Sequence, residues 1–432
     1  MAKNSKLQIA VVGAGIAGLT ATIALASHPN IDVQIYERAT KLQEIGASIA
    51  LGPNGMRTLD RLGIHNALDD EIAFRNTKTK FPHIYRHFKT NEIVSADNYQ
   101  GHVDRRHYTS RYYRAHLQQA LLSHVKPSQV HLGKSFHSVT FDSSIRKLVI
   151  RFIDGTTAQA DILLGSDGIH SAVRRNFVPT SGTKWTGWVT FRSVFPISHV
   201  SHIKDLPDEA NHYWGHDRSL FLSKLGKDLF TVVGSYQSDP DAPDAPYKDA
   251  LWDQDGDVNV LKEYYKDWSP LIRAIVDAVP HTRIYPNAAA HGLDTWVLGD
   301  GRVTLAGDAA HAHGGAYAAG GSLAIDDAWA FASSIRHVFP EEATAVPSEE
   351  DIKRALRIYD YTRRPHTDRV LHNVHLGNKA KVERIGNNES DEELRQRIQK
   401  RENPTWIHEH DVVKTFEDAV RKEEGGRIEA RL

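Results

Sequence analysis

Apolar runs and turn residues alternate regularly at the N-terminal end of the chain. Residues 7–12, LQIAVV, form an unbroken apolar run that predicts a buried strand, and residues 16–27 predict a helix with small residues on one side. Residues 31–36, IDVQIY, predict a second strand. A strand, a helix and a second strand in this order are typical of the start of a parallel sheet.

The pattern changes character after this unit. Helices are predicted at 56–72 and 110–125, and HSVTFDSS, KLVIRFIDG, DILLGSDG and RVTLA predict strands. From about 184 to 290, strand-like pieces such as WVTFRSVF and DLFTVVGSY are separated by loops rich in Pro and Asp, which indicates a mainly β second domain. After residue 350 the chain is helical and highly charged.

The composition excludes several classes of function. The 432 residues include 53 Lys and Arg against 54 Asp and Glu, a balance that does not favour nucleic acid binding. There are no cysteines, so disulfides, thiolate catalysis and cysteine-ligated metals are excluded. Glycines interrupt the longest apolar run, and we predict no membrane span. We expect a cytoplasmic protein, with peroxisomal delivery as the alternative because Ala430-Arg431-Leu432 resembles a peroxisomal address.

A glycine-rich turn, GAGIAG, joins the first predicted strand to the first predicted helix. Gly13 permits the tight turn, Gly15 lets a pyrophosphate approach the backbone, and Gly18 lets helix and strand pack closely. Glu37, at the end of the second strand, can accept hydrogen bonds from a ribose diol, which favours FAD or NAD over NADP. A glycine-rich turn without a ligand is the alternative interpretation.

Two later segments decide between these cofactors. LGSDGIHSAVR at 164–174 and TLAGDAAH at 304–311, together with GAGIAG, resemble the fingerprints of the single-component FAD-dependent aromatic hydroxylases, the class A flavoprotein monooxygenases that include p-hydroxybenzoate and salicylate hydroxylases. The resemblance implies an α/β fold, in which a Rossmann-like FAD-binding domain is interwoven with a mainly β substrate domain and followed by a helical C-terminus. We assign 1–80, 105–183 and 291–375 to the FAD-binding domain, 81–104 and 184–290 to the substrate domain, and 376–432 to the C-terminal segment.

The resemblance also implies a set of residues that hold FAD. Asp167 and Gly168 would lie near the pyrophosphate, Asp308 would contact the ribityl chain, and Arg114 would open a helix that holds the cofactor. The helix that begins near Gly320 would point its N-terminus at the flavin pyrimidine. Simpler roles stay open, since Asp167 and Asp308 could cap helices and Arg114 could pair with a surface carboxylate. The full expected set is Gly13, Gly15, Ala17, Gly18, Glu37, Arg38, Gly46, Ala47, Arg114, Asp167, Gly168, Gly307, Asp308, Gly320, Gly321 and Ser322.

The activity implied by this resemblance is hydroxylation of an electron-rich aromatic ring. FAD would be reduced by NADH or NADPH and would react with O2 through a flavin C4a-hydroperoxide, while the protein positions the substrate and excludes water. A small phenolic substrate is expected, either salicylate-like or a polyketide phenol, and the protein would be a monomer or a homodimer. A dehydrogenase or oxidase of the same fold and a non-catalytic flavin-binding protein are the alternatives.

Arg192, on the predicted strand WVTFRSVF, is the main candidate for contacting the substrate. A phenol reacts faster as its phenolate, so a cation is expected near the substrate oxygen. An ordinary exposed strand charge is the alternative for Arg192. Weaker candidates for lining the pocket are Tyr213, Trp214, His102 and Tyr236.

The segment HGGAY departs from the family pattern. Relatives usually carry a proline where Gly315 stands and a glycine where Ala318 stands. Tyr317 and His313 are therefore expected to fill this space and face the substrate. The 25 histidines include no pair at the helical spacing that builds a zinc site, and we predict no catalytic metal.

Overall fold

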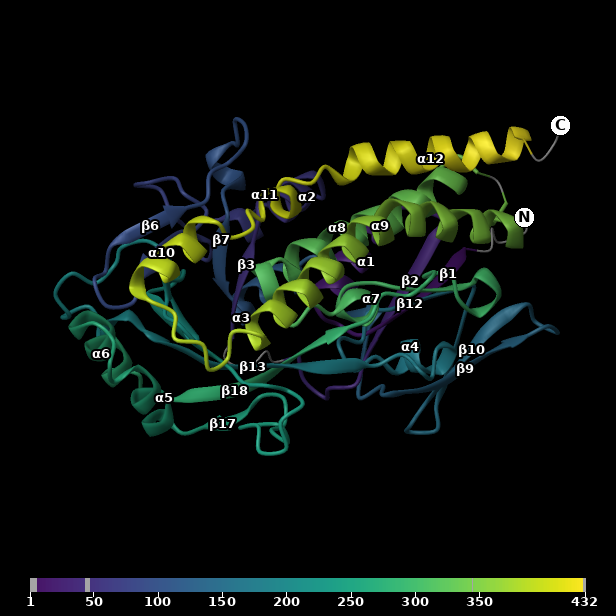
Figure 1. Cartoon of the computed structure of the whole chain (residues 1–432). Coiled ribbons are helices and arrows are strands. Elements are labelled where there is room, and N and C mark those ends of the chain that lie inside the picture. The colour runs from purple at the N-terminus through teal and green to yellow at the C-terminus, as the bar shows by residue number, and fades with distance from the viewer. Residues whose placement is uncertain (1–5, 43–46, 344, 430–432) are drawn as a thin grey trace.

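A five-stranded parallel sheet forms the first layer of the molecule (Figure 1). The computed structural model describes residues 6–42, 47–343 and 345–429, so Gly46 and the final three residues lie outside the described part of the chain. Each strand pairs in parallel with its neighbour, as expected when the crossovers are helical. Along the sheet the strands are β19 (Val303–Leu305), β12 (Ile162–Gly165), β1 (Leu7–Val12), β2 (Ile31–Glu37) and β8 (Val130–Leu132).

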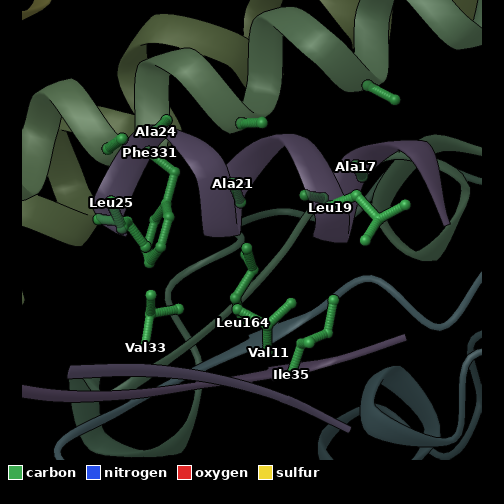
Figure 2. Packing of buried hydrophobic residues seen from close by; sticks show 14 of the residues in the cluster. Val11, Ala17, Leu19, Ala21, Ala24, Leu25, Val33, Ile35, Leu164 and Phe331 are labelled. Carbon is green, nitrogen blue, oxygen red and sulfur yellow. The ribbon is translucent and has the colours of Figure 1, made fainter. Parts of the chain in front are cut away.

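Helix α1 (Ile16–Ala26) lies between this sheet and α8 (Gly320–Val338). Figure 2 shows Val11 and Leu164 rising from the strands beneath α1, and Phe331 of α8 packed alongside it. All three side chains are buried, and burial of each apolar side chain of this size is worth about 1.5 to 3 kcal/mol. The N-terminal end of α1 is therefore held rigidly at the carboxyl edge of the sheet.

An eight-stranded sheet forms the second part of the molecule, with its own apolar core. Two separate stretches of chain build it, because two strands from residues 81–104 pair with the strands that follow residue 182. Only β14 and β5 run parallel among its neighbouring pairs. In order, the strands are β17 (Gln254–Gly256), β18 (Thr282–Ala290), β13 (Thr183–Pro196), β16 (Leu229–Gln237), β15 (Arg218–Lys224), β14 (Asn211–Trp214), β5 (Ile84–His87) and β6 (Ile93–Ala96).

Two predicted helices are shorter than the sequence pattern indicated. The helix expected at 110–125 begins at Arg114, because Ser110–Tyr113 pair as a strand with two others and their aromatic side chains suit a pleated surface. The helix expected at 56–72 ends at Arg61, where Gly63 takes a φ of +73°. The two small sheets consist of β3 (Ser48–Leu51), β7 (Ser110–Tyr113) and β4 (Phe74–Arg75), and of β9 (Phe136–Asp142), β10 (Lys147–Phe152) and β11 (Thr157–Ala160).

The C-terminal part of the chain returns across the molecule (Figure 1). The domain boundary expected at residue 375 falls inside α9 (Glu349–Val382), which continues without a break, and Leu394 and Ile398 of α10 (Asp391–Gln399) enter the core of the eight-stranded sheet. No helix in the described part of the chain is long and apolar enough to cross a membrane. The other helices are α2 (Pro53–Arg61), α3 (Arg114–Leu122), α4 (Ala172–Phe177), α5 (Val258–Tyr265), α6 (Pro270–Asp277), α7 (Asp308–His311), α11 (Thr405–His408) and α12 (Val412–Glu429).

Candidate active site

The GAGIAG turn leaves space for a ligand at one glycine and none at the other two. A Cβ on Gly13 would lie 2.4 Å from the Ser166 carbonyl oxygen, and a Cβ on Gly18 would lie 2.0 Å from the Gly13 carbonyl oxygen. At Gly15, by contrast, a Cβ would meet nothing within 4 Å. Gly15 is also the N-cap of α1 and has no side-chain cap, so the first amides of this helix are available to an anion. The turn therefore fits a pyrophosphate.

The Glu37 carboxylate is held against this turn. It accepts hydrogen bonds from the backbone N–H of Ala14 at 2.8 Å and of Ala39 at 2.9 Å. Each carboxylate oxygen has a second lone pair, so a ribose diol could still bind. Arg38 lies close to the loop at Asp167, because its charge, after burial and Arg175, lowers the pKa of His170.

The Asp308 carboxylate has no hydrogen-bond donor among the residues the structure describes, and it is exposed to the same space. Its position depends on Gly307, whose φ is +60° and whose N–H donates to Asp327 at 2.8 Å. Arg174 of α4 fixes the other side by donating to the Ala310 carbonyl oxygen at 3.1 Å. An available carboxylate on a rigid turn suits the hydroxyl groups of a ribityl chain.

Buried ionic contacts hold this turn in place. Asp327 of α8 is fully buried and accepts from His311 Nε2 at 2.6 Å and from Arg363 Nε at 2.8 Å. Burial alone would raise the pKa of Asp327, but His311 and Arg363 together lower it to about 2. Asp327 therefore stays ionised, which keeps the Gly307 amide paired.

Three predicted cofactor residues turn their side chains elsewhere. Asp167 caps α4, since its carboxylate accepts from Ser171 Oγ and from the Ala172 N–H at 2.7 Å, which is the simpler role that the sequence left open. Ser322 Oγ accepts from the Gly52 N–H at 2.8 Å. Ala47 is buried, and its carbonyl oxygen accepts from the N–H of Arg114. Their backbones, and not these side chains, are what the site could use.

A single cavity of 1350 Å³ connects these groups to the eight-stranded sheet. Pockets for one small ligand occupy about 300 to 1,000 Å³, so this cavity has room for a cofactor and a second molecule. Its first wall consists of Gly15, Ala17, Arg114, Gly168, Gly307, Asp308, Gly320 and Gly321.

Arg192 stands in the second wall of the cavity, on β13. Its Nε donates to Thr190 Oγ1 at 3.2 Å, and its guanidinium lies 4.9 Å from the centre of the Tyr285 ring. Within the described residues, no carboxylate lies within 4 Å of it, although burial and the nearby Arg114 lower its pKa. A Cβ on Gly315 would lie 3.3 Å from Arg192 Nη2, so the guanidinium crosses the backbone where relatives usually carry proline.

His313 and Tyr317 both line the cavity, but they differ in their contacts. His313 is buried with neither ring nitrogen hydrogen-bonded in the described chain, and burial, with a smaller contribution from His311, lowers its pKa to about 4. Tyr317 instead donates its hydroxyl to Glu402 Oε2 at 2.6 Å. Burial and Glu402 raise the pKa of Tyr317. The Tyr317 hydroxyl therefore faces the C-terminal segment.

The third wall was missed by the sequence interpretation. Residues 376–404, which we call the C-terminal cover, line the cavity with several charged side chains, including Lys381 and Arg384. The aromatic-flanked stretch near residue 406 was the one signal in the sequence that this segment packs on the rest of the protein. Of the weaker candidates, Trp214 and Tyr236 line the cavity, whereas Tyr213 is buried in the core of the sheet and His102 is exposed.

Comparison with known proteins agrees with this geometry. Residues 6–374 match the family described as FAD binding domain. The chain is 29% identical to 6-hydroxynicotinate 3-monooxygenase of Pseudomonas fluorescens over 77% of this chain and 83% of that protein, and 26% identical to a salicylate hydroxylase of Pseudomonas putida over 85% and 84%. A salicylate hydroxylase substrate complex superimposes with a TM-score of 0.77 at 21% identity over 96% of this chain and 98% of that one. HpxO of Klebsiella pneumoniae, solved with FAD and uric acid, superimposes with a TM-score of 0.71 at 22% identity over 96% and 97%, and these likenesses confirm the predicted fold class.

Proposed function

This chain belongs to the FAD binding domain family, among the FAD-dependent aromatic monooxygenases, and from that premise we propose that it hydroxylates a small phenolic substrate held by Arg192. The observation that carries this proposal is the Arg192 guanidinium, which stands in the wall of a cavity that also contains the predicted cofactor residues. No carboxylate of the described chain neutralises it within 4 Å. A cation in this position suits a phenolate oxygen.

The residues at the first wall support binding of FAD in this cavity. The amides at the start of α1 suit the pyrophosphate, Glu37 suits the ribose, and Asp308 suits the ribityl hydroxyls. When bound, FAD supplies the redox chemistry that no side chain offers, since it takes a hydride from NAD(P)H and activates O2 so that one oxygen atom enters the ring. Gly320 and Gly321 begin α8 and bring the positive end of its dipole to the cavity, where it would stabilise a reduced, anionic cofactor.

Arg192 would prepare the substrate for attack. An opposite charge within about 4 to 6 Å favours the ionised form of a phenol, and the phenolate ring is richer in electrons. The hydrogen bond to Thr190 and the stacking on Tyr285 fix the guanidinium before the substrate arrives. Because Arg192 remains charged throughout, it orients the oxygen and takes no proton.

Protons and water also need control in such a reaction. His313 is uncharged near pH 7, since its pKa is lowered to about 4, so it can offer one N–H and one lone pair to a bound molecule without adding charge. The C-terminal cover separates the cavity from solvent on one side, which limits access of water to the reacting atoms.

Oxygen consumption provides the direct test. We expect the purified protein with FAD to oxidise NADH or NADPH faster when a phenol is present, and mass spectrometry to detect a product heavier by one oxygen atom. The variant Arg192→Ala should keep FAD and lose about 10² in kcat/KM, the size seen when one group that stabilises developing charge is removed. Arg283→Ala is the matched control, since Arg283 pairs with Arg192 across the strands but contacts Asp253 and Asp255.

Two results would refute this proposal. If no phenol accelerates NAD(P)H oxidation while a substrate alone reduces the flavin, the protein is a dehydrogenase or oxidase. If Arg192→Ala and Arg283→Ala have the same kinetics as the unmodified protein, Arg192 does not hold the substrate.

A further inference from the structure

Lys381 brings a second positive charge into the cavity, opposite the sheet. It lies in the last turn of α9, and its ammonium stands 4.5 Å from the centre of the Trp188 ring on β13. In the described part of the chain, the ammonium has no hydrogen-bond acceptor and no carboxylate within 4 Å. Lysine side chains this close to the interior are ordinarily paired, so the missing partner requires an explanation.

The surroundings of Lys381 are more positive than negative. Arg384 also lines the cavity and makes no ion pair in the described chain, whereas Arg397 is bound by Glu389, with its Nε 2.6 Å from Oε1 and its Nη2 2.8 Å from Oε2. One carboxylate thus serves three cations. Burial, followed by Arg384 and Arg397, lowers the pKa of Lys381 to about 8, so the ammonium is largely protonated at pH 7.

The facing part of the sheet offers donors and ring faces but no carboxylate. The indole N–H groups of Trp188 and Trp214 have no acceptor in the described chain. His212 lies in the same wall, and burial and then Lys381 lower its pKa to about 3, so it is neutral. Aromatic faces and unpaired donors together match a flat molecule that carries an anionic oxygen group.

We propose that Lys381 binds a carboxylate of the substrate, so that the substrate is a phenolic acid held by Arg192 at its phenolic oxygen and by Lys381 at its acid group. The second half of this statement rests on the proposed hydroxylase function. Trp188 and Arg192 lie four residues apart on β13, and their side chains point to the same face of the sheet. The two cations therefore contact different ends of one molecule.

Paired acids and amides test this proposal with the FAD-loaded protein. The panel consists of hydroxylated aromatic acids, with the carboxylate on the ring or on an arm of one to three carbons, and the carboxamide of each. Binding is measured from the change in the flavin absorption spectrum, without turnover. Lys381→Met should weaken binding of the acids about 10- to 100-fold, as expected when a charge-assisted hydrogen bond is lost, and should leave the amides within about threefold. Lys381→Arg should restore most of the affinity for acids.

Lys379→Met is the matched control, because Lys379 lies in the same helical turn with its side chain 76% exposed and pairs with Glu383. Equal weakening of acids and amides by Lys381→Met, or no saturable binding of any acid by the unmodified protein, would overturn the proposal. So would an unchanged affinity for acids accompanied by a higher KM for NADH or NADPH, since the anion would then belong to the nicotinamide cofactor. If acids bind through Lys381 and still fail to stimulate NAD(P)H oxidation, the hydroxylase proposal fails and the carboxylate site stands.

Discussion

Gly315 allows a direct test of the contact between the strained loop and Arg192. Its φ is +74°, a conformation that costs an L-residue about 1 to 2 kcal/mol. A Cβ added there would also lie 3.3 Å from Arg192 Nη2 and 3.9 Å from Asn287 Nδ2. Gly315→Ala should therefore lower the free energy of unfolding by about 1 to 2 kcal/mol and also displace the guanidinium.

Gly63 separates these two effects. Its φ of +73° is almost the same, its surroundings hold nothing within 4 Å of a Cβ, and it lies on the surface away from the cavity. Gly63→Ala should cost the same amount of stability, measured by urea denaturation, without changing the kinetics. A displaced positioning group can cost about 10² in rate, so we expect Gly315→Ala to lower kcat/KM about 10- to 100-fold with FAD binding unchanged.

A double-mutant cycle strengthens the test. In the Arg192→Ala background, Gly315→Ala should have only its backbone cost and no further effect on kcat/KM, because the contact is already gone. Gly315→Pro, which restores the residue common in relatives, demands a φ near −65° and should disturb the loop more than alanine does. Equal kinetics for Gly315→Ala and Gly63→Ala would show that Arg192 does not depend on this backbone.

Three further outcomes follow from the described contacts. Asp327→Asn should lower the free energy of unfolding by about 3 to 5 kcal/mol, seen as a lower Tm, because it leaves the buried Arg363 without its carboxylate. Glu37→Ala and Asp308→Ala should each raise the Kd for FAD in equilibrium dialysis, and full retention of FAD by both would contradict their assignment. Since burial, Arg384 and Arg397 place the pKa of Lys381 at about 8, the affinity for aromatic acids should be highest below pH 8 and fall as the pH rises above it, while His212 stays neutral and the amides show no change.

The cofactor turn could be predicted from the sequence because its causes are local. Gly13 and Gly18 are needed where the chain meets its own backbone within a few residues and at the neighbouring strand, and these requirements determine the residue type. Glu37 follows from the length of the second strand. The side chain of Asp167 was harder to place, because a carboxylate before a helix can either cap that helix or face a ligand, and the helix start four residues later decides for the cap.

The C-terminal cover could not be predicted, because its contacts join residues far apart in the sequence. Arg401 pairs with Asp97, 304 positions earlier, and Tyr317 pairs with Glu402. A highly charged helical pattern ordinarily indicates a face turned to solvent. Here the charges of Lys381 and Arg384 face a cavity, and only the arrangement of the three walls reveals this.

The departure from the family pattern at residues 313–318 and the C-terminal cover belong to one arrangement. Tyr317 and Ala318 have φ of +57° and +51°, and each such residue costs about 1 to 2 kcal/mol unless other contacts hold it. His408 Nε2 donates to the Tyr317 carbonyl oxygen at 3.1 Å, and the Tyr317 hydroxyl donates to Glu402, so two hydrogen bonds, worth about 0.5 to 3 kcal/mol each, offset the strain. A proline at 315 could not adopt the left-handed backbone that this loop requires. Glycine at 315 is therefore the residue that lets the C-terminal cover hold the loop beneath Arg192, and through it this distant segment shapes the substrate end of the cavity.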